Sequence, residues 1–341
     1  MDRGFISWLQ QQQVSLAFTT YQTNWLALLG VDEQGQISAF QRQFSRAMGL
    51  FTSSERLYLA TRYQIWQLDN VLQQGENYQG YDKLYIPRIA YTTGDLDTHD
   101  LGVDAQGQIL FISTLLNCLA TVSPRNSCTP LWHPPFISQV VNEDRCHLNG
   151  LAMVVGQPKY VTVCSQSDVI DGWRDRRVHG GCVLEIPSGE VVVQGLSMPH
   201  SPRVYQGRLW LLNSGTGEFG FVDLARGQFE AVTFCPGYGR GLAFWDRFAV
   251  VGLSHPRDRT FSGLPLEAKL QEKDSAARCG LLIIDLHQGT IIHWLRIEGT
   301  ITELYDVGVL PGVRRPMALG FQTDEIAQLL TLDPLSRLVG G

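Results

Sequence analysis

The chain has 341 residues, of which 44% are apolar and 18% are charged, so it can bury a substantial core and is neither a disordered nor a coiled-coil protein. Lys and Arg number 27 against 33 Asp and Glu, which gives a formal charge of −6. Because this balance includes no basic run, we expect no nucleic-acid partner.

The N-terminal segment, residues 1–8, lacks the basic start and apolar core of a secretory signal. The longest apolar runs, such as residues 279–286, are far shorter than the roughly 20 residues that cross a bilayer. The seven cysteines include no CxxC pair and are typical of reduced thiols. These features predict a cytoplasmic protein without a membrane segment.

Seven similar units follow one another along the chain. Each opens with a short strand at or near a glycine and continues, after a tight turn, into a second strand rich in Val, Ile, Leu and aromatic residues. The openings are residues 14–20, 48–54, 99–107, 147–156, 200–207, 239–246 and 305–312.

Some units add a third and a fourth strand, as in residues 217–234 and 279–297, with hairpin turns between them. A four-stranded meander repeated every roughly 40 to 50 residues is typical of a propeller blade. We therefore predict an all-β fold, a single antiparallel β-propeller over residues 1–341, with an N-terminal extension (1–13) and a C-terminal tail (324–341). Seven blades are favoured. Six are the alternative, because the last unit shows only two clear strands before the helix-like segment 325–332.

Five strings carry a family resemblance that runs over nearly the whole chain. RCHLNGLA (145–152), DGWRDRR (171–177), GLSMPHSPR (195–203), LWLLNSGTGE (209–218) and ELYDVGVLPG (303–312) resemble an uncharacterised bacterial and cyanobacterial family of unknown function. More distantly, HLNGLA is similar to a strand opening of the gluconolactonase and strictosidine-synthase propellers. That similarity implies a calcium site at Asn149 and reaches no other ligand.

In a propeller the inner strands of all blades begin at the same end of the central channel. Residues that occupy the same position within each repeat, which we call one repeat phase, therefore lie close together in space. Three consecutive units place a histidine at this phase: His99, His147 and His200. Three imidazoles have the number and chemistry of ligands for Zn²⁺ or another divalent transition metal with an open coordination position. The alternative is a set of polar residues that only bind backbone groups or water.

Further polar residues occur at or near this phase. The candidate catalytic groups, which could orient an imidazole or act as a base, are Asp100, Asp306, Tyr305 and Tyr238. The candidate substrate-binding groups are Arg203, Arg240, Asn149 and Arg88.

The favoured hypothesis is a metal-dependent lyase, hydrolase or isomerase that acts on a small polar or anionic molecule or on a peptide group. The alternative is a non-catalytic propeller that binds a ligand, or a partner protein through the charged loop 171–177. A calcium-dependent lactonase, with oxygen ligands at the channel, is the third hypothesis.

Overall fold

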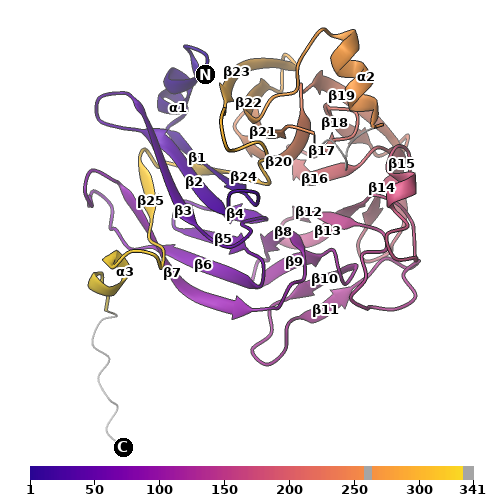
Figure 1. Cartoon of the computed structure of the whole chain (residues 1–341), viewed down its shortest axis with the longest axis horizontal. Coiled ribbons are helices and arrows are strands. Elements are labelled where there is room, and N and C mark those ends of the chain that lie inside the picture. Colours follow the sequence, from indigo (N-terminus) through magenta and orange to yellow (C-terminus); the bar gives the residue numbers. More distant parts are fainter. Residues whose placement is uncertain (257–262, 333–341) are drawn as a thin grey trace, which may run out of the picture.

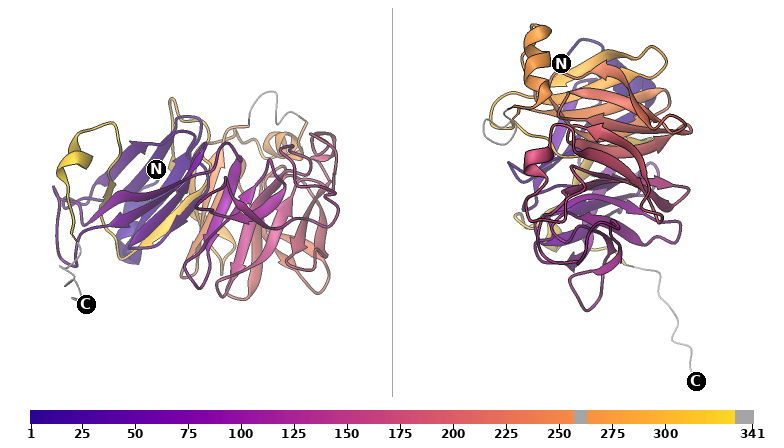
Figure 2. Two further views of the ribbon diagram at one scale, coloured as in Figure 1. Left: turned by 90° about the horizontal axis from the view of Figure 1, so that it is seen from below. Right: turned by 90° about the vertical axis from the view of Figure 1, so that its right-hand side faces the viewer.

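The protein is a β-propeller of six blades around a central axis (Figure 1); its computed structural model describes residues 1–256 and 263–332. The inner strands contact one another in a ring, in the order β24, β4, β8, β12, β16 and β20. Figure 2 shows the ring from two further directions. No helix in the described ranges is long and apolar enough to cross a membrane.

Each blade is an antiparallel meander of four strands. The first contains β24 (Val307–Pro311), β1 (Val14–Thr20), β2 (Trp25–Val31) and β3 (Ile37–Gln43). The second contains β4 (Leu50–Thr52), β5 (Arg56–Ala60), β6 (Gln64–Asn70) and β7 (Lys83–Thr92), with β25 (Pro316–Ala318) added in parallel to β7. The third contains β8 (Thr98–Val103), β9 (Ile109–Ser113), β10 (Cys118–Thr121) and β11 (Thr129–Trp132).

The other three blades repeat this order. The fourth contains β12 (Leu148–Val154), β13 (Gln157–Val163), β14 (Gly181–Glu185) and β15 (Val191–Leu196). The fifth contains β16 (Pro199–Tyr205), β17 (Arg208–Asn213), β18 (Glu218–Asp223) and β19 (Gln228–Phe234). The sixth contains β20 (Tyr238–Trp245), β21 (Phe248–Ser254), β22 (Gly280–Asp285) and β23 (Thr290–Arg296).

The prediction of seven blades is wrong and the alternative of six is confirmed. The first and last units of the sequence belong to one blade, because β24 pairs with β1, as in the register Leu16 with Val309. The segment 14–20 is thus the second strand of its blade, and the inner strand comes from the other end of the chain. Strand β25, the second strand of the supposed last blade, joins the outer edge of the second blade instead.

The burial of each strand follows its place in the blade. The second strands β9 and β21 are buried at every position, because neighbouring blades cover both of their faces. Their sequences, ILFIS and FAVVGLS, are accordingly runs of apolar and small residues. The outer strand β3 has no buried position, and the exposure of its side chains alternates.

Helices lie outside the blades. Helix α1 (Phe5–Gln12), in the predicted N-terminal extension, buries Phe5, Trp8 and Leu9 against the first and sixth blades. Helix α2 (Pro265–Glu272) and the 3-10 turn η1 (Arg174–Arg176) lie over one face of the ring (Figure 2). Within the helix-like segment 325–332, the structure has the short helix α3 (Glu325–Gln328). The sequence between β21 and β22 contains α2, and its residues 257–262 lie outside the described part.

Hydroxyl groups connect neighbouring blades near the axis. At four of the six junctions, a Thr or Ser at the end of one blade's second strand donates to a backbone carbonyl of the next blade's inner segment. The pairs are Thr19 to Met48 (2.5 Å), Thr114 to Leu148 (2.6 Å), Ser214 to Gly239 (2.6 Å) and Ser254 to Leu304 (2.9 Å). These bonds fix the inner strands, and therefore the side chains at their starts.

The Ser254→Ala variant is expected to lower the free energy of unfolding by about 1–3 kcal/mol, measured by urea denaturation. Ser254 Oγ also accepts the Leu304 N–H at 3.0 Å, so the substitution leaves both backbone groups of a buried residue without a partner. Ser188→Ala is the matched control, because the exposed Ser188 hydroxyl also makes two hydrogen bonds. Equal losses in the two variants would contradict the assignment of Ser254 as a clamp between blades.

Candidate functional site

A cavity of about 360 Å³ lies at the end of the ring where the inner strands begin. We call it the axial pocket. Strand starts from several blades and two loops contribute its lining, which consists of Tyr21, Arg46, Met48, Asp97, His99, Asp144, His147, Trp173, Arg174, Met198, Arg240 and Tyr305.

His99 and His200 occupy equivalent positions, but His147 does not share their phase. Asp97 and Met198, two residues before these histidines, have positive φ angles of 49° and 48°. The carbonyls of Asp97 and Met198 accept the N–H groups of the residues that follow β9 and β17. His147 itself has a φ of 51°, and its carbonyl accepts the N–H that follows β13. His147 therefore corresponds to Asp97 and Met198, and Asn149 takes the phase of the other two histidines.

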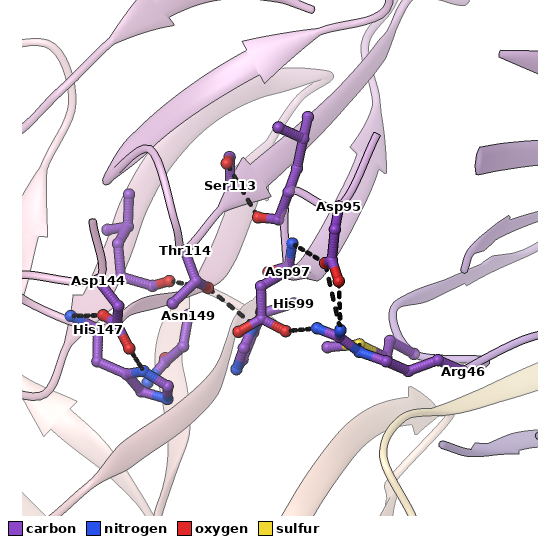
Figure 3. Close-up of polar contacts among 12 residues, drawn as sticks. Arg46, Asp95, Asp97, His99, Ser113, Thr114, Asp144, His147 and Asn149 are labelled. Carbon is purple, nitrogen blue, oxygen red and sulfur yellow. Dashed lines mark hydrogen bonds and ion pairs between the residues drawn. The ribbon is translucent and has the colours of Figure 1, made fainter. Parts of the chain in front are cut away.

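The imidazole of His99 is held in one orientation (Figure 3). Its Nδ1 lies 2.8 Å from the Asp97 carbonyl oxygen and 2.7 Å from Thr114 Oγ1. Since the Thr114 hydroxyl hydrogen is donated to Leu148, Nδ1 carries the proton and Nε2 keeps its lone pair. Burial lowers the pKa of His99 to about 4, so the ring is neutral at pH 7.

His147 forms a pair with a carboxylate that the sequence analysis did not single out. Asp144 Oδ2 lies 2.8 Å from His147 Nδ1, and Asp144 Oδ1 accepts the His147 backbone N–H at 3.0 Å (Figure 3). Trp173 Nε1 donates to the same Oδ2 at 2.9 Å, and the Trp173 ring stacks on the imidazole with 4.2 Å between centroids. Because a carboxylate only accepts, Nδ1 carries a proton, and in the neutral ring this leaves the Nε2 lone pair for a ligand.

His200 repeats the bond of His99, with Nδ1 2.8 Å from the Met198 carbonyl oxygen. Its Nε2 is buried and has no hydrogen-bond partner in the described structure. Burial lowers the pKa of His200 well below its usual value, and the nearby Arg240 adds to this effect. His200 contacts the Met198 carbonyl and the Tyr238 ring, and it is not among the residues that line the axial pocket.

The acidic side chains of Glu303 and Asp97 stabilise the charged form of the buried Arg240, but without a direct ion pair among the described residues. Only 8% of Arg240 is exposed, its Nε is buried without a hydrogen-bond partner, and no ion pair between described residues involves it. Its guanidinium carbon lies 4.9 Å from the Tyr305 ring, 5.4 Å from the Tyr238 ring and 5.7 Å from the Tyr21 ring. Aromatic faces stabilise a cation, but a buried guanidinium normally also has a carboxylate or another anion as its partner.

Ring contacts connect these groups in a continuous arc. His147 and His99 are 4.9 Å apart between centroids, and His99 and Tyr305 are 5.4 Å apart. Tyr305 contacts Arg240, which contacts Tyr238, which in turn lies 5.6 Å from His200. The arc places three imidazoles, two phenols and one guanidinium beside one another.

Two other arginines line the pocket, and both pair with acidic side chains: Arg174 pairs with Asp171, and Arg46 pairs with two aspartates. Arg46 Nη1 lies 2.9 Å from Asp95 Oδ2, and its Nη2 pairs with Asp97 (Figure 3). Its charge is therefore matched by direct ion pairs, whereas Arg240 makes none with a described residue.

Asp100, Arg203 and Asp306 form a separate network deeper in the ring. Arg203 Nη1 and Nη2 lie 2.7 and 3.1 Å from the two Asp100 oxygens, and Nη2 lies 3.8 Å from Asp306 Oδ1. Asp100 also accepts the Leu151 N–H, and Asp306 accepts the Leu50 N–H, each from the next blade at 2.9 Å. Burial raises the pKa of Asp306, and Arg203 opposes that shift. These contacts favour a structural role, and the predicted catalytic and substrate-binding roles find no support in them.

Two predicted binding residues lie away from the pocket. Asn149 is buried within its blade, where its amide group contacts the Thr162 hydroxyl (2.6 Å) and Cys164 Sγ (3.4 Å). Arg88 lies on β7, the fourth strand of its blade, and donates to Thr331. Its predicted place at the channel is therefore wrong.

The metal prediction stays a prediction. Within residues 1–256 and 263–332, no three His, Cys, Asp or Glu side chains are grouped closely enough to bind a metal ion. Each of the three imidazoles nevertheless donates Nδ1–H to an oxygen, which is the support that metal-binding histidines commonly have.

Sequence reasoning missed Asp144 and misjudged Trp173. Asp144 stands three residues before His147, close enough for its carboxylate to accept the backbone N–H of that residue, and this spacing was the available signal. The charged loop 171–177 was offered as a partner-binding surface, but its Trp173 is only 4% exposed, because it packs against His147 and the Arg174 guanidinium.

Comparisons with known proteins place the fold. A model of the family described as "Domain of unknown function (DUF4915)" matches residues 3–319. No protein with curated annotation matches the chain. One chain in the crystal structure of a nidogen/laminin complex aligns with a TM-score of 0.55 at 12% identity, over 88% of this chain and 99% of that one. A streptogramin B lyase aligns with a TM-score of 0.48 at 10% identity, over 86% of this chain and 83% of that one.

A selenomethionine-substituted virginiamycin B lyase from Staphylococcus aureus gives a TM-score of 0.43 at 12% identity, over 70% of this chain and 73% of that one. At 12% identity, the match to the nidogen/laminin complex is evidence about the fold alone.

Proposed function

The chain belongs to the DUF4915 family, whose description assigns no activity, and we propose a function from the axial pocket. The protein is an enzyme that binds a small anionic molecule and transfers a proton through His147. The observation that carries the proposal is the buried Arg240 guanidinium. A charge removed from water without a direct ion pair is costly, and an anion bound beside Arg240 in the pocket would compensate that cost.

The pair of Asp144 and His147 supplies the catalytic part of the proposal. With Nδ1–H held by the carboxylate, the free Nε2 can accept a proton from the bound molecule or from a water beside it. Asp144 then stabilises the imidazolium, and His147 returns the proton to the product or the leaving group. This role fits lyase, hydrolase and isomerase chemistry alike.

Incubation of the protein with a panel of small carboxylates and phosphates, followed by NMR, tests this function. The wild type should convert at least one compound. The His147→Gln variant should still bind that compound but turn it over about 10²–10⁴ times more slowly. Binding without turnover in both proteins would support the non-catalytic alternative instead. Unchanged turnover in the variant would rule out His147 as the base.

A metal-dependent form of the enzyme is the second candidate. The observation in its favour is that His99, His147 and His200 all keep Nδ1 on an oxygen, and that the buried Nε2 of His200 has no hydrogen-bond partner in the described structure. A bound zinc ion would supply an activated water or a polarised substrate oxygen. Elemental analysis of protein purified without a His tag checks this candidate, which requires stoichiometric metal in the wild type and its loss in His200→Ala.

A further inference from the structure

The axial pocket presents hydrogen-bond donors at one side. Arg240 contributes guanidinium N–H groups, and the Tyr305 hydroxyl is buried without a hydrogen-bond partner in the described structure. Burial holds the pKa of Tyr305 well above its usual value, so this hydroxyl keeps its proton and can donate it in a hydrogen bond. One guanidinium and one hydroxyl match the two oxygens of a planar carboxylate.

A phosphate dianion is a poorer match for this side of the pocket. Arg46 is already paired with Asp95 and Asp97, so it adds no free positive charge. Asp97 and Asp144, which also line the pocket, would repel a second negative charge.

The adjacent side of the pocket presents acceptors. The Nδ1–H groups of His99 and His147 are both engaged by oxygens, so each ring turns an Nε2 lone pair toward a ligand. A neutral imidazole Nε2 of this kind requires a hydroxyl or N–H group on its partner.

The Tyr305 ring lies between the two sides, 4.9 Å from the Arg240 guanidinium carbon and 5.4 Å from the His99 centroid. One small molecule can therefore contact both sides at once. Building on the proposed function, we infer that the ligand is a small carboxylate with a hydrogen-bond donor, a hydroxyl or an N–H, close to the carboxylate. The carboxylate binds Arg240 and Tyr305, and the donor binds Nε2 of His99 or His147.

Two matched pairs of compounds test this inference by calorimetric titration in the presence of EDTA. Mandelate differs from phenylacetate by one hydroxyl, and hippurate differs from 4-oxo-4-phenylbutanoate by an N–H in place of a methylene. In at least one pair, the compound with the donor should bind about tenfold tighter or more, because the other leaves a buried acceptor unpaired. The pair that shows this preference identifies the donor as hydroxyl or N–H.

Two variants of His99 locate the acceptor. The preference should disappear in His99→Phe and persist in His99→Gln, whose amide oxygen can still accept. If the preference is lost in His147→Phe and unchanged in His99→Phe, the acceptor of the ligand's donor group is His147, and this result also supports the inference.

Three results would overturn the inference. If the members of both pairs bind equally well and Arg240→Met weakens all of them, the anion site stands but the ligand needs no donor. If no compound binds, or if binding is indifferent to Arg240, the inference and the proposed anion site fail together. If a preference appears only after zinc is restored and is lost in His200→Phe, the imidazoles hold a metal instead.

Discussion

Replacing Arg203 by methionine is expected to lower the free energy of unfolding by about 3–5 kcal/mol, the usual cost of breaking a buried ion pair by removing one partner. Arg203 makes two short contacts with Asp100 and a longer one with Asp306, and both carboxylates are at least 96% buried. Without the guanidinium, two buried carboxylates that each clamp a neighbouring blade would face one another.

Urea unfolding at pH 7 measures this loss. The control is Arg174→Met, because Arg174 pairs with Asp171 at 2.8 Å while both side chains are more than half exposed. Exposed pairs of this kind contribute about 0–1 kcal/mol. A loss in Arg203→Met no larger than in the control would contradict the structural role of the network and restore Arg203 as a candidate for substrate binding.

The Arg240→Met variant is expected to keep most of its stability and to lose affinity for its ligand. Its free energy of unfolding should fall by no more than about 1 kcal/mol, because the loss of contacts with three tyrosine rings is offset by the removal of a buried charge that has no direct ion pair with a described residue. Its affinity for a carboxylate should fall by about 2 kcal/mol or more, on the order of thirtyfold in Kd.

The contrast between the two arginines is informative because both are mostly buried and both lie near the axis. A stability loss in Arg240→Met as large as in Arg203→Met would mean that Arg240 is a structural residue and that the pocket needs no anion. Urea unfolding of the ligand-free variants distinguishes the two roles.

The six-blade closure could be predicted only in part from the sequence. The meander pattern predicts the fold, because the local sequence of each unit indicates its strands and turns. The pairing of Leu16 with Val309 joins segments almost a whole chain apart, and no local pattern encodes it. Two strand openings at the chain ends therefore counted as two blades where the structure has one.

The site was predicted by residue type more accurately than by register. His99, His147, Arg240 and Tyr305 all line the axial pocket, as the repeat phase implied. The phase of His147 was nevertheless displaced by two residues. Irregular pairing shifts the register of β8, β12, β16 and β20 near their starts. Counting back from a glycine cannot detect such bulges, which change the residue that meets the axis.

Calorimetric titration of the wild type and Arg240→Met with the tightest-binding carboxylate of a panel tests the central claim most directly. The account predicts saturable binding to the wild type at one site per chain and binding at least about thirtyfold weaker to the variant. Equal affinities in the two proteins, or a wild type that binds no carboxylate of the panel, would contradict it.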